Sequence, residues 1–213
     1  MNKSILTALF SITVSLTFSQ VVINEYSCGN KNLTDNFGRT PDWIELFNSG
    51  TGAVDISGYH LSDNLTLPLK WAFPSGTTIA AGNYLRVWCS GQDTLLAGNH
   101  HTNFKLAQCK PDEVLFTNGS GGLIDSVHLR RHQKNHSWGR SPDGATTWKL
   151  FTSPTPNASN GINGLNGYAV KPSLSLAPGF YSSSQSVSLS TPELNSSIRY
   201  TTNGTEPTAT STL

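Results

Sequence analysis

The segment from Trp71 to Trp88 constrains the fold most, because its pattern suits a β-sheet and little else. Trp71 and Phe73 end at Pro74, and a turn bounded by glycines follows. The chain then enters Tyr84–Cys89, where aromatic and aliphatic side chains alternate, as is typical of a strand. Large side chains point to both faces of this strand, so we expect it to lie inside a sheet.

Further strand patterns recur at short spacing. They cover Val21–Tyr26, Asp42–Phe47, Val54–Leu61, Tyr84–Cys89, Asn103–Ala107, Glu113–Thr117 and Leu123–Arg130. Asn, Asp, Ser and Gly clusters that suit tight turns separate them, and no long segment keeps a helical period. The sequence therefore predicts an all-β sandwich.

The N-terminus has the pattern of a secretory signal peptide. Lys3 precedes the apolar run Ile5–Phe18, and the small Ser19 stands before Gln20. The run is shorter than the roughly 20 residues that a spanning helix needs. We therefore expect residues 1–19 to be removed, no membrane span, and a mature protein that is secreted or at the cell surface.

Charge and cysteine content narrow the class of protein. Without Lys3, the 14 basic side chains become 13 and balance the 13 acidic ones. A neutral mature chain argues against a nucleic-acid or membrane-surface binder. Cys89 ends one predicted strand and Cys109 precedes another, so they are the favoured disulfide pair, leaving Cys28; other pairings stay open.

A linker composition divides the chain. Residues 154–168 are rich in Pro, Asn, Gly and Ser, and a second β pattern follows with strands expected at Ser186–Ser190 and Ile198–Thr202. We expect a sandwich over 20–160, a linker over 161–170 and a partial β-module over 171–213. Because about 43 residues are too few to close a sandwich, we expect the protein to continue past Leu213.

Several short motifs follow one another in a family-specific order. They are Val22–Tyr26, Asp42–Asn48, Val54–Asp63, Trp71–Trp88, Thr102–Leu106, Asp112–Phe116, Ile124–Val127, Ser137–Gly144 and Pro154–Asn157. In this order, residues 21–160 resemble the bacterial, secreted branch of the lamin-tail domain family. The resemblance implies an immunoglobulin-like β-sandwich that is a non-enzymatic interaction module of exported or surface proteins.

The second segment resembles the small module at the C-terminus of chitobiases and β-hexosaminidases. The residues that carry this resemblance are Pro178–Tyr181, the strand around Val187, and Ile198–Thr208, with Asn203 where that family often has Asp. The resemblance implies further domains downstream, including a hydrolase or a spore-coat-protein-H-type kinase.

Three carboxylates are the candidates for a calcium site. Glu25, Asp42 and Glu45 would need to converge, since calcium takes several oxygen ligands together. The favoured alternative is that these carboxylates pair with Arg39 or Arg86, because an unpaired charge inside an apolar strand is costly. His128, His132 and His136 would share one face only on a helix, and no helix is expected there, so their spacing does not indicate a zinc site. We expect no metal and no cofactor.

Two groups of residues are candidates for binding. Arg130, Arg131 and Lys134 form a dense basic run that suits an anionic partner, or else a solvated loop. Trp138 and Trp148 are candidates for stacking on a glycan, whereas Trp43 and Trp88 are expected to pack inside the fold.

The motifs of catalysis are missing from the sequence. Gly119-Ser120-Gly121 lacks the strand-to-helix setting of a nucleophile elbow, and no phosphate-binding glycine loop occurs. We expect a non-catalytic secreted binding or spacer module of a larger exported or surface protein, attached to an extracellular polymer or protein partner. The alternative is the N-terminal accessory arm of an exported enzyme whose catalytic domain lies beyond Leu213.

Overall fold

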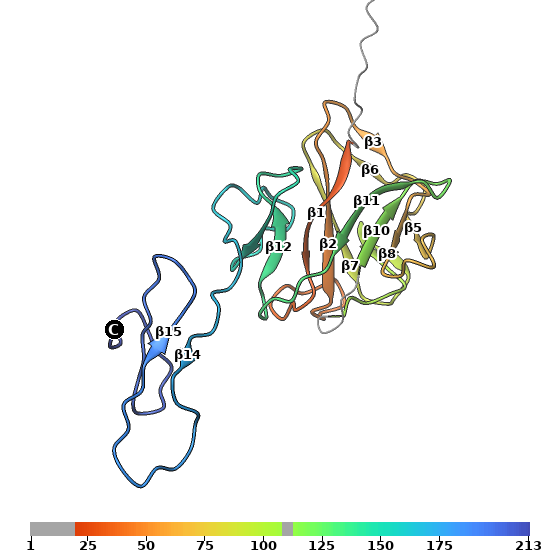
Figure 1. The fold of residues 1–213 in the computed structure, drawn as a ribbon. Coiled ribbons are helices and arrows are strands. Elements are labelled where there is room, and N and C mark those ends of the chain that lie inside the picture. The colour runs from red at the N-terminus through yellow and green to blue at the C-terminus, as the bar shows by residue number, and fades with distance from the viewer. Residues whose placement is uncertain (1–19, 108–112) are drawn as a thin grey trace, which may run out of the picture. The chain divides into compact units, whose positions relative to one another are not determined.

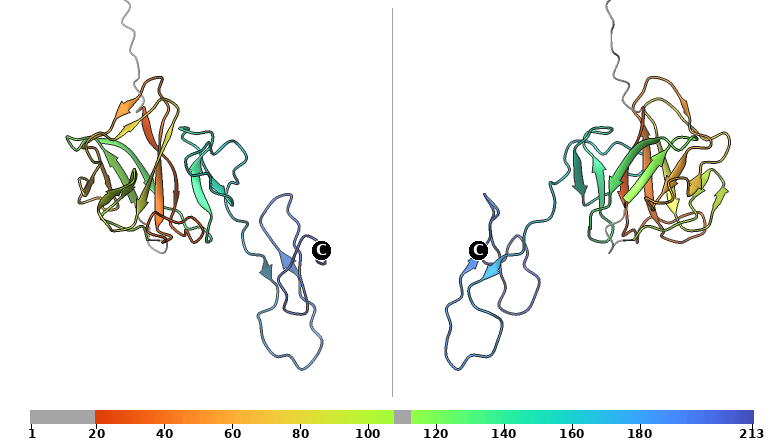
Figure 2. Two further views of the ribbon diagram at one scale, coloured as in Figure 1. Left: turned by 180° about the vertical axis from the view of Figure 1, so that it is seen from behind. Right: turned by 45° about the vertical axis from the view of Figure 1, so that its right-hand side comes forward.

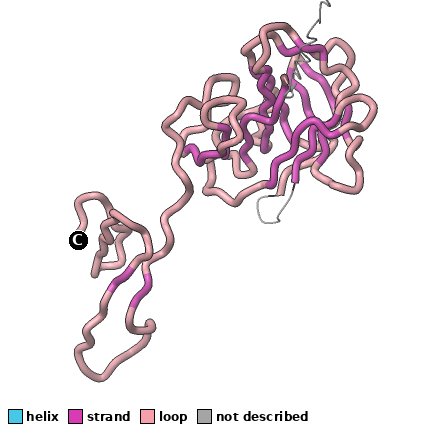
Figure 3. The backbone as a smooth tube through the Cα atoms, turned by 45° about the horizontal axis from the view of Figure 1, so that its top comes forward, coloured by secondary structure: helices cyan, strands magenta, loops and turns pink. Residues whose placement is uncertain are grey.

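The computed structural model describes residues 20–107 and 113–213 and divides into two compact units. These are Met1–Asn166, called the first domain below, and Gly167–Leu213, called the second module. The boundary between them falls within residues 161–170. Every regular element of the described chain is a strand, so the fold is all-β (Figure 3).

The first domain is built on two principal sheets (Figure 1). The large sheet has seven strands in the order β13-β12-β1-β2-β7-β9-β8: β1 Val21–Ser27, β2 Asp42–Asn48, β7 Tyr84–Cys89, β8 Thr94–Leu96, β9 Asn99–His101, β12 Ser137–Arg140 and β13 Trp148–Phe151. The small sheet has the order β11-β10-β4-β5: β4 His60–Ser62, β5 Trp71–Ala72, β10 Glu113–Thr117 and β11 Leu123–His128. A short pair, β3 Val54–Asp55 with β6 Thr78–Ile79, stands beside them.

The core lies between the two sheets, which face each other in both views of Figure 2. It is made by one alternating row from each strand, as the period of two requires. Fully buried members include Ile23, Ile44, Leu61, Val87 and Phe116. The burial of these rows is what fixes the pairing register of the strands.

One ion pair joins the sheets beside this core. Asp125 of β11 receives hydrogen bonds of 2.9 and 3.0 Å from the guanidinium of Arg140 in β12 and one of 2.8 Å from the backbone N–H of Ile23. Arg140 also donates to the carbonyls of Ile23 and Ala145 at 2.7 and 2.6 Å. Strands β1, β11 and β12 are thereby held at one point.

Several strand predictions are confirmed and others are wrong. Tyr84–Cys89 and Glu113–Thr117 have the predicted bounds, and β7 lies inside the sheet between β2 and β9. Val54–Leu61 is broken into β3 and β4 because Gly58, at φ 71°, forms a turn. No strand forms at 103–107; the chain in this part of the sheet pairs earlier, through β9.

The second module has little regular structure. Its strands are β14 Ser173–Leu174 and β15 Leu189–Ser190, with a single bridge from Tyr200 to Thr212. Apolar side chains such as Leu174 and Val187 border an open cavity of about 570 Å³ and remain half exposed. The described residues include no helix that is long and apolar enough to cross a membrane.

Candidate binding site

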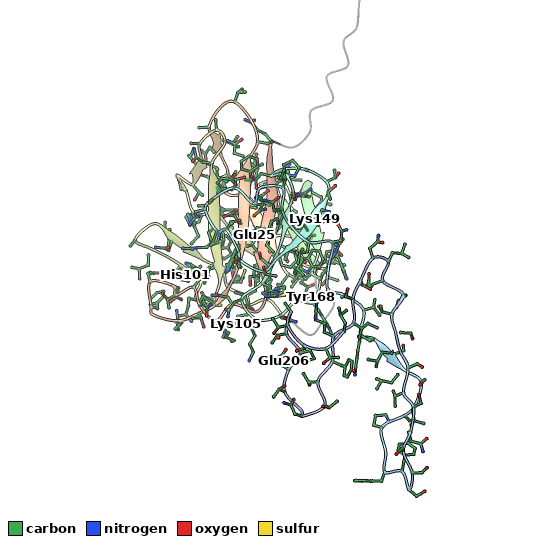
Figure 4. All side chains as sticks on the ribbon, turned by 90° about the vertical axis from the view of Figure 1, so that its left-hand side faces the viewer. Glu25, His101, Lys105, Lys149, Tyr168 and Glu206 are labelled. Carbon is green, nitrogen blue, oxygen red and sulfur yellow. The ribbon has the colours of Figure 1, made fainter. Side chains whose placement is uncertain are left out.

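The outer face of the large sheet, turned away from the core, carries a row of charged side chains. Glu25 of β1 pairs with Glu45 of β2, which pairs with Arg86 of β7. Glu25 lies amid the strands of the first domain (Figure 4). Both glutamates are fully buried, so their partners decide what they can do.

Each glutamate has one partner in the sheet and one in the chain that follows β13. Glu25 accepts hydrogen bonds from the Ser137 hydroxyl at 2.5 Å and from the backbone N–H of Thr155 at 3.3 Å. Glu45 accepts from the backbone N–H of Asn157 and, at 3.5 Å, from the Asn24 amide. The two carboxylates therefore bind the loop 153–161 to the sheet; we call this loop the latch.

Asp143 is the third carboxylate of this network. It accepts hydrogen bonds from the Asn24 amide at 2.9 Å, the Tyr84 hydroxyl at 2.9 Å, the backbone N–H of Asn160 at 3.1 Å and the Ser159 hydroxyl. It lies in the turn after β12 and ties this turn to the latch.

The pKa values of the three carboxyls diverge. Burial raises the pKa of Glu25 to about 7 and that of Glu45 to about 8, and hydrogen bonds only partly offset the effect. Burial also pushes the pKa of Asp143 upward, but the hydrogen bonds from Ser159, Asn24 and Asn160 outweigh it and leave that pKa below its usual value. As the pH rises, Asp143 is therefore the first of the three carboxyls to become negatively charged.

Asn160 closes the latch. Its side-chain amide donates to the carbonyls of Asn24 and Arg140 at 3.3 and 3.0 Å, and its side-chain oxygen accepts from the Thr155 hydroxyl at 2.8 Å. Gly139 of β12 makes room for it, because a Cβ at this glycine would lie 2.5 Å from the Asn160 nitrogen. The polar groups of this network hydrogen-bond to one another, and together they hold the latch against the sheet.

The structure does not bring the three calcium candidates together. Glu25 and Glu45 share the outer face, but Asp42 lies three residues from Glu45 and points to the other face, where it accepts from the backbone N–H of Asn30 at 3.1 Å. Within the described ranges, no group of three His, Cys, Asp or Glu side chains is arranged to hold a metal ion. Arg39, one predicted partner, pairs with Asp35 instead.

The predicted basic run lies on the loop between β11 and β12, which crosses from the small sheet to the large one. Arg130, Arg131 and Lys134 are all exposed there. The loop itself is anchored, since the His132 ring accepts from the backbone N–H of Cys28 at 2.9 Å and Asn135 accepts from that of Lys31 at 2.8 Å. A role for the three cations in binding stays a prediction.

Of the two tryptophans predicted to stack on a glycan, Trp138 is buried and Trp148 is half buried, so a contact through Trp148 stays a prediction. Trp138 is buried, and the Arg130 guanidinium lies 4.8 Å from its ring centre. Trp148 is half buried against Tyr26, with ring centres 5.6 Å apart, and against Arg140. Trp138 thus offers no ring face to a glycan, because β12 turns it toward the core. Trp43 and Trp88 are buried, as their pattern indicates.

Two of the three cysteines lie among the residues that the structure describes. Cys28 and Cys89 are both buried, and burial raises the pKa of the Cys89 thiol well above its usual value. Cys109, the predicted partner of Cys89, lies outside the described residues, so that pairing stays a prediction.

Asp143 and Asn160 are not among the site residues that the sequence predicts. Asp143 falls within the motif Ser137–Gly144, and Asn160 ends the expected sandwich of residues 20–160, but neither residue had a predicted role. The signal available was the pair of motifs Ser137–Gly144 and Pro154–Asn157, which meet in the network.

Comparisons with known proteins agree with this architecture. The family model described as Lamin Tail Domain matches residues 15–131, more than half of the chain. The model described as Chitobiase/beta-hexosaminidase C-terminal domain matches residues 176–213. No curated protein matches the chain. Strands β12 and β13, which complete the large sheet, lie beyond the first match.

Proposed function

Because this chain belongs to the lamin tail domain family, we propose that it acts as a non-catalytic binding or spacer module of an exported or cell-surface protein. Its two β-rich parts are of accessory type rather than catalytic type. The first domain would contact an extracellular polymer or protein, and the second module would extend the chain from it.

One observation carries the proposal. The three carboxyls of the network on the outer face, Glu25, Glu45 and Asp143, accept hydrogen bonds from hydroxyl, amide and backbone groups of the latch and of strand β12. A general acid or base needs to reach a substrate proton directly or through one water. Groups committed to holding a loop serve the fold.

Export is the second element of the proposal, and it rests on the signal pattern over residues 1–19. Balanced charge in the mature chain supports a partner other than nucleic acid. The exposed cations Arg130, Arg131 and Lys134 are then candidates for the rim of a contact surface.

The test uses residues 20–213 purified and mixed with insoluble chitin, cellulose and peptidoglycan. We expect the chain to sediment with at least one of these materials and to release no product from fluorogenic glycosides. Turnover of such a substrate would contradict the proposal, as would a chain that stays in the supernatant with every material and with whole-cell envelopes.

An accessory arm of an exported enzyme is the alternative function. It is favoured by the match of residues 176–213 to a domain named after chitobiase and β-hexosaminidase. The intact mass of the exported protein distinguishes the two. A mass well above 22.9 kDa together with glycosidase activity in the native protein would support the arm of an enzyme.

A further inference from the structure

Three leucines stand on one loop of the first domain with half or more of each residue exposed to solvent. Leu65, Leu67 and Leu69 lie between β4 and β5 and are 61%, 55% and 50% exposed. Single exposed leucines need no explanation, whereas apolar side chains gathered on one surface indicate contact with another molecule. We call residues 63–70 the leucine loop.

Hydrogen bonds hold the leucine loop in shape. The Asn64 side-chain oxygen accepts from the backbone N–H and the hydroxyl of Thr66 at 2.9 and 2.8 Å, and the Asn64 carbonyl accepts from the N–H of Leu67 at 3.0 Å. The Lys70 carbonyl accepts from the Asn103 amide at 2.8 Å, which ties the loop to the chain after β9. The leucines are therefore presented to solvent by a hydrogen-bonded loop, and they do not fold back onto the core.

The leucine loop carries no net charge. Its two charged side chains, Asp63 and Lys70, stand at its two ends and pair with each other at 2.5 Å. Residues 64–69, which lie between them, are all uncharged. The surface that this loop presents is therefore suited to apolar contact and not to attraction between charges.

The size and composition of the loop favour a lipid surface over a protein partner. A stable protein interface takes roughly 800 Å² from each partner and is anchored mostly by Trp, Tyr and Arg, with Leu under-represented. Three partly exposed leucines supply only part of such an area, and residues 63–70 include no Trp, Tyr or Arg. A bilayer needs no matching shape, and apolar side chains enter it at the boundary between headgroups and acyl chains.

We propose that the leucine loop inserts into the surface of a lipid bilayer and gives the protein a peripheral contact with a membrane. Since basic and acidic side chains balance in the mature chain, this attachment depends on the burial of apolar side chains and not on anionic headgroups. The loop enters only the interfacial layer, so no spanning segment is involved. A lipid partner goes beyond the polymer or protein partner of the proposed function.

The experiment sediments residues 20–213 with sucrose-loaded vesicles of phosphatidylcholine, and with vesicles that also contain phosphatidylglycerol. One myristoyl chain binds a bilayer with an association constant of about 10⁴ M⁻¹, and three partly buried leucines offer less apolar area. We therefore expect half of the protein to be bound at a lipid concentration on the order of 1 mM. Binding to the two kinds of vesicle should be equal and should not weaken when salt is added.

The variant that tests the location is Leu65→Ser with Leu67→Ser. Both side chains are exposed, so the fold is retained, and the melting temperature checks this. Loss of two inserted side chains raises the lipid concentration for half-binding by about tenfold or more. The matched control is Ile162→Ser with Leu194→Ser, which removes two apolar side chains that are 76% and 90% exposed outside the loop and leaves binding unchanged.

Three results would overturn the inference. The first is a parent chain that sediments with neither kind of vesicle, or a leucine variant that binds as well as the parent. The second is binding that requires phosphatidylglycerol and is abolished by Arg130→Gln with Lys134→Gln, which would assign the contact to the basic run. The third is self-association of the parent without lipid, measured by sedimentation velocity, that the leucine variant loses, which would assign the leucines to a second copy of the chain.

The vesicle experiment and the test of the proposed function can fail separately. The leucine variant should still sediment with the polymer that the parent binds, because the loop contacts lipid only. Loss of polymer binding in this variant would also overturn the inference, since the loop would then belong to the polymer site.

Discussion

Two glutamates on neighbouring strands make the stability of this protein depend on pH. Glu25 and Glu45 are fully buried, and burial raises their pKa values to about 7 and about 8. Their carboxyls titrate near 4.5 in the unfolded chain, so the folded state binds protons more tightly. Their contribution is therefore fully present below about pH 4.5 and is lost as the pH rises through 7 and 8.

We predict that the free energy of unfolding falls between about pH 5 and pH 9, as the two carboxyls lose protons that the folded state binds more tightly. Glu45→Gln stays neutral at all pH values and flattens the curve. Urea denaturation at intervals of pH measures both effects. Glu113→Gln, on the small sheet, serves as the control and should keep the slope of the parent. Identical slopes for the parent and Glu45→Gln would show that Glu45 does not cause the pH dependence of stability.

The ion pair of Asp125 and Arg140 is a second feature, at the scale of single residues, that determines the stability of the first domain. Their side chains are only 14% and 9% exposed, and Asp125 also accepts the backbone N–H of Ile23. Removing one partner leaves a charge buried without compensation.

We predict that Asp125→Ala lowers the free energy of unfolding by about 3 kcal/mol, measured by urea denaturation at neutral pH. Lys70→Ala breaks the more exposed pair with Asp63 and should cost no more than about 1 kcal/mol. Equal costs for the two variants would show that the buried pair has no special role in joining the sheets.

At the scale of elements, the latch packs against strand β12 at Gly139, where the lack of a side chain leaves room for Asn160. Asn160 donates to the carbonyl of Arg140. A Cβ added to Gly139 would lie only 2.5 Å from the side-chain nitrogen of Asn160. The glycine is required by this close approach, since its φ lies outside the left-handed region.

We predict that Gly139→Ala destabilises the first domain by about 1–3 kcal/mol, because the added methyl displaces the Asn160 amide. Gly52→Ala, where a Cβ would meet nothing within 4 Å, is the matched control. In a double-mutant cycle, Asn160→Ala should remove much of the extra cost of Gly139→Ala. Additive effects of the two substitutions would disprove the contact.

The same elements show how far the sequence could be interpreted. Strands with clear alternation, such as Tyr84–Cys89, were predictable because both faces bury large side chains. Strand β12 was not, since Ser137-Trp138-Gly139-Arg140 mixes a glycine and a charge whose roles depend on Asn160 and Asp125 far along the chain. Parity along β2 does separate Asp42 from Glu45, so the divergence of the calcium candidates could have been anticipated.

At the scale of the whole molecule, the first domain extends past the residues that match the family. The match ends at residue 131, yet β12 pairs with β1 and brings in Arg140, while β13 and the latch follow. A chain cut at 131 would leave β1 as an unpaired edge, Asp125 without its cation and Glu25 without Ser137 and Thr155.

We therefore predict that residues 20–166 unfold cooperatively, with the same midpoint as the first-domain transition of residues 20–213, whereas residues 20–131 do not fold. Circular dichroism and urea denaturation of the three chains measure this. Limited proteolysis of 20–213 should cut within 161–170 and leave a stable fragment, because the boundary between the compact units lies there. A folded 20–131 would mean that the ion pair and the latch are dispensable, and a midpoint that drops on removing 167–213 would mean that the second module supports the first.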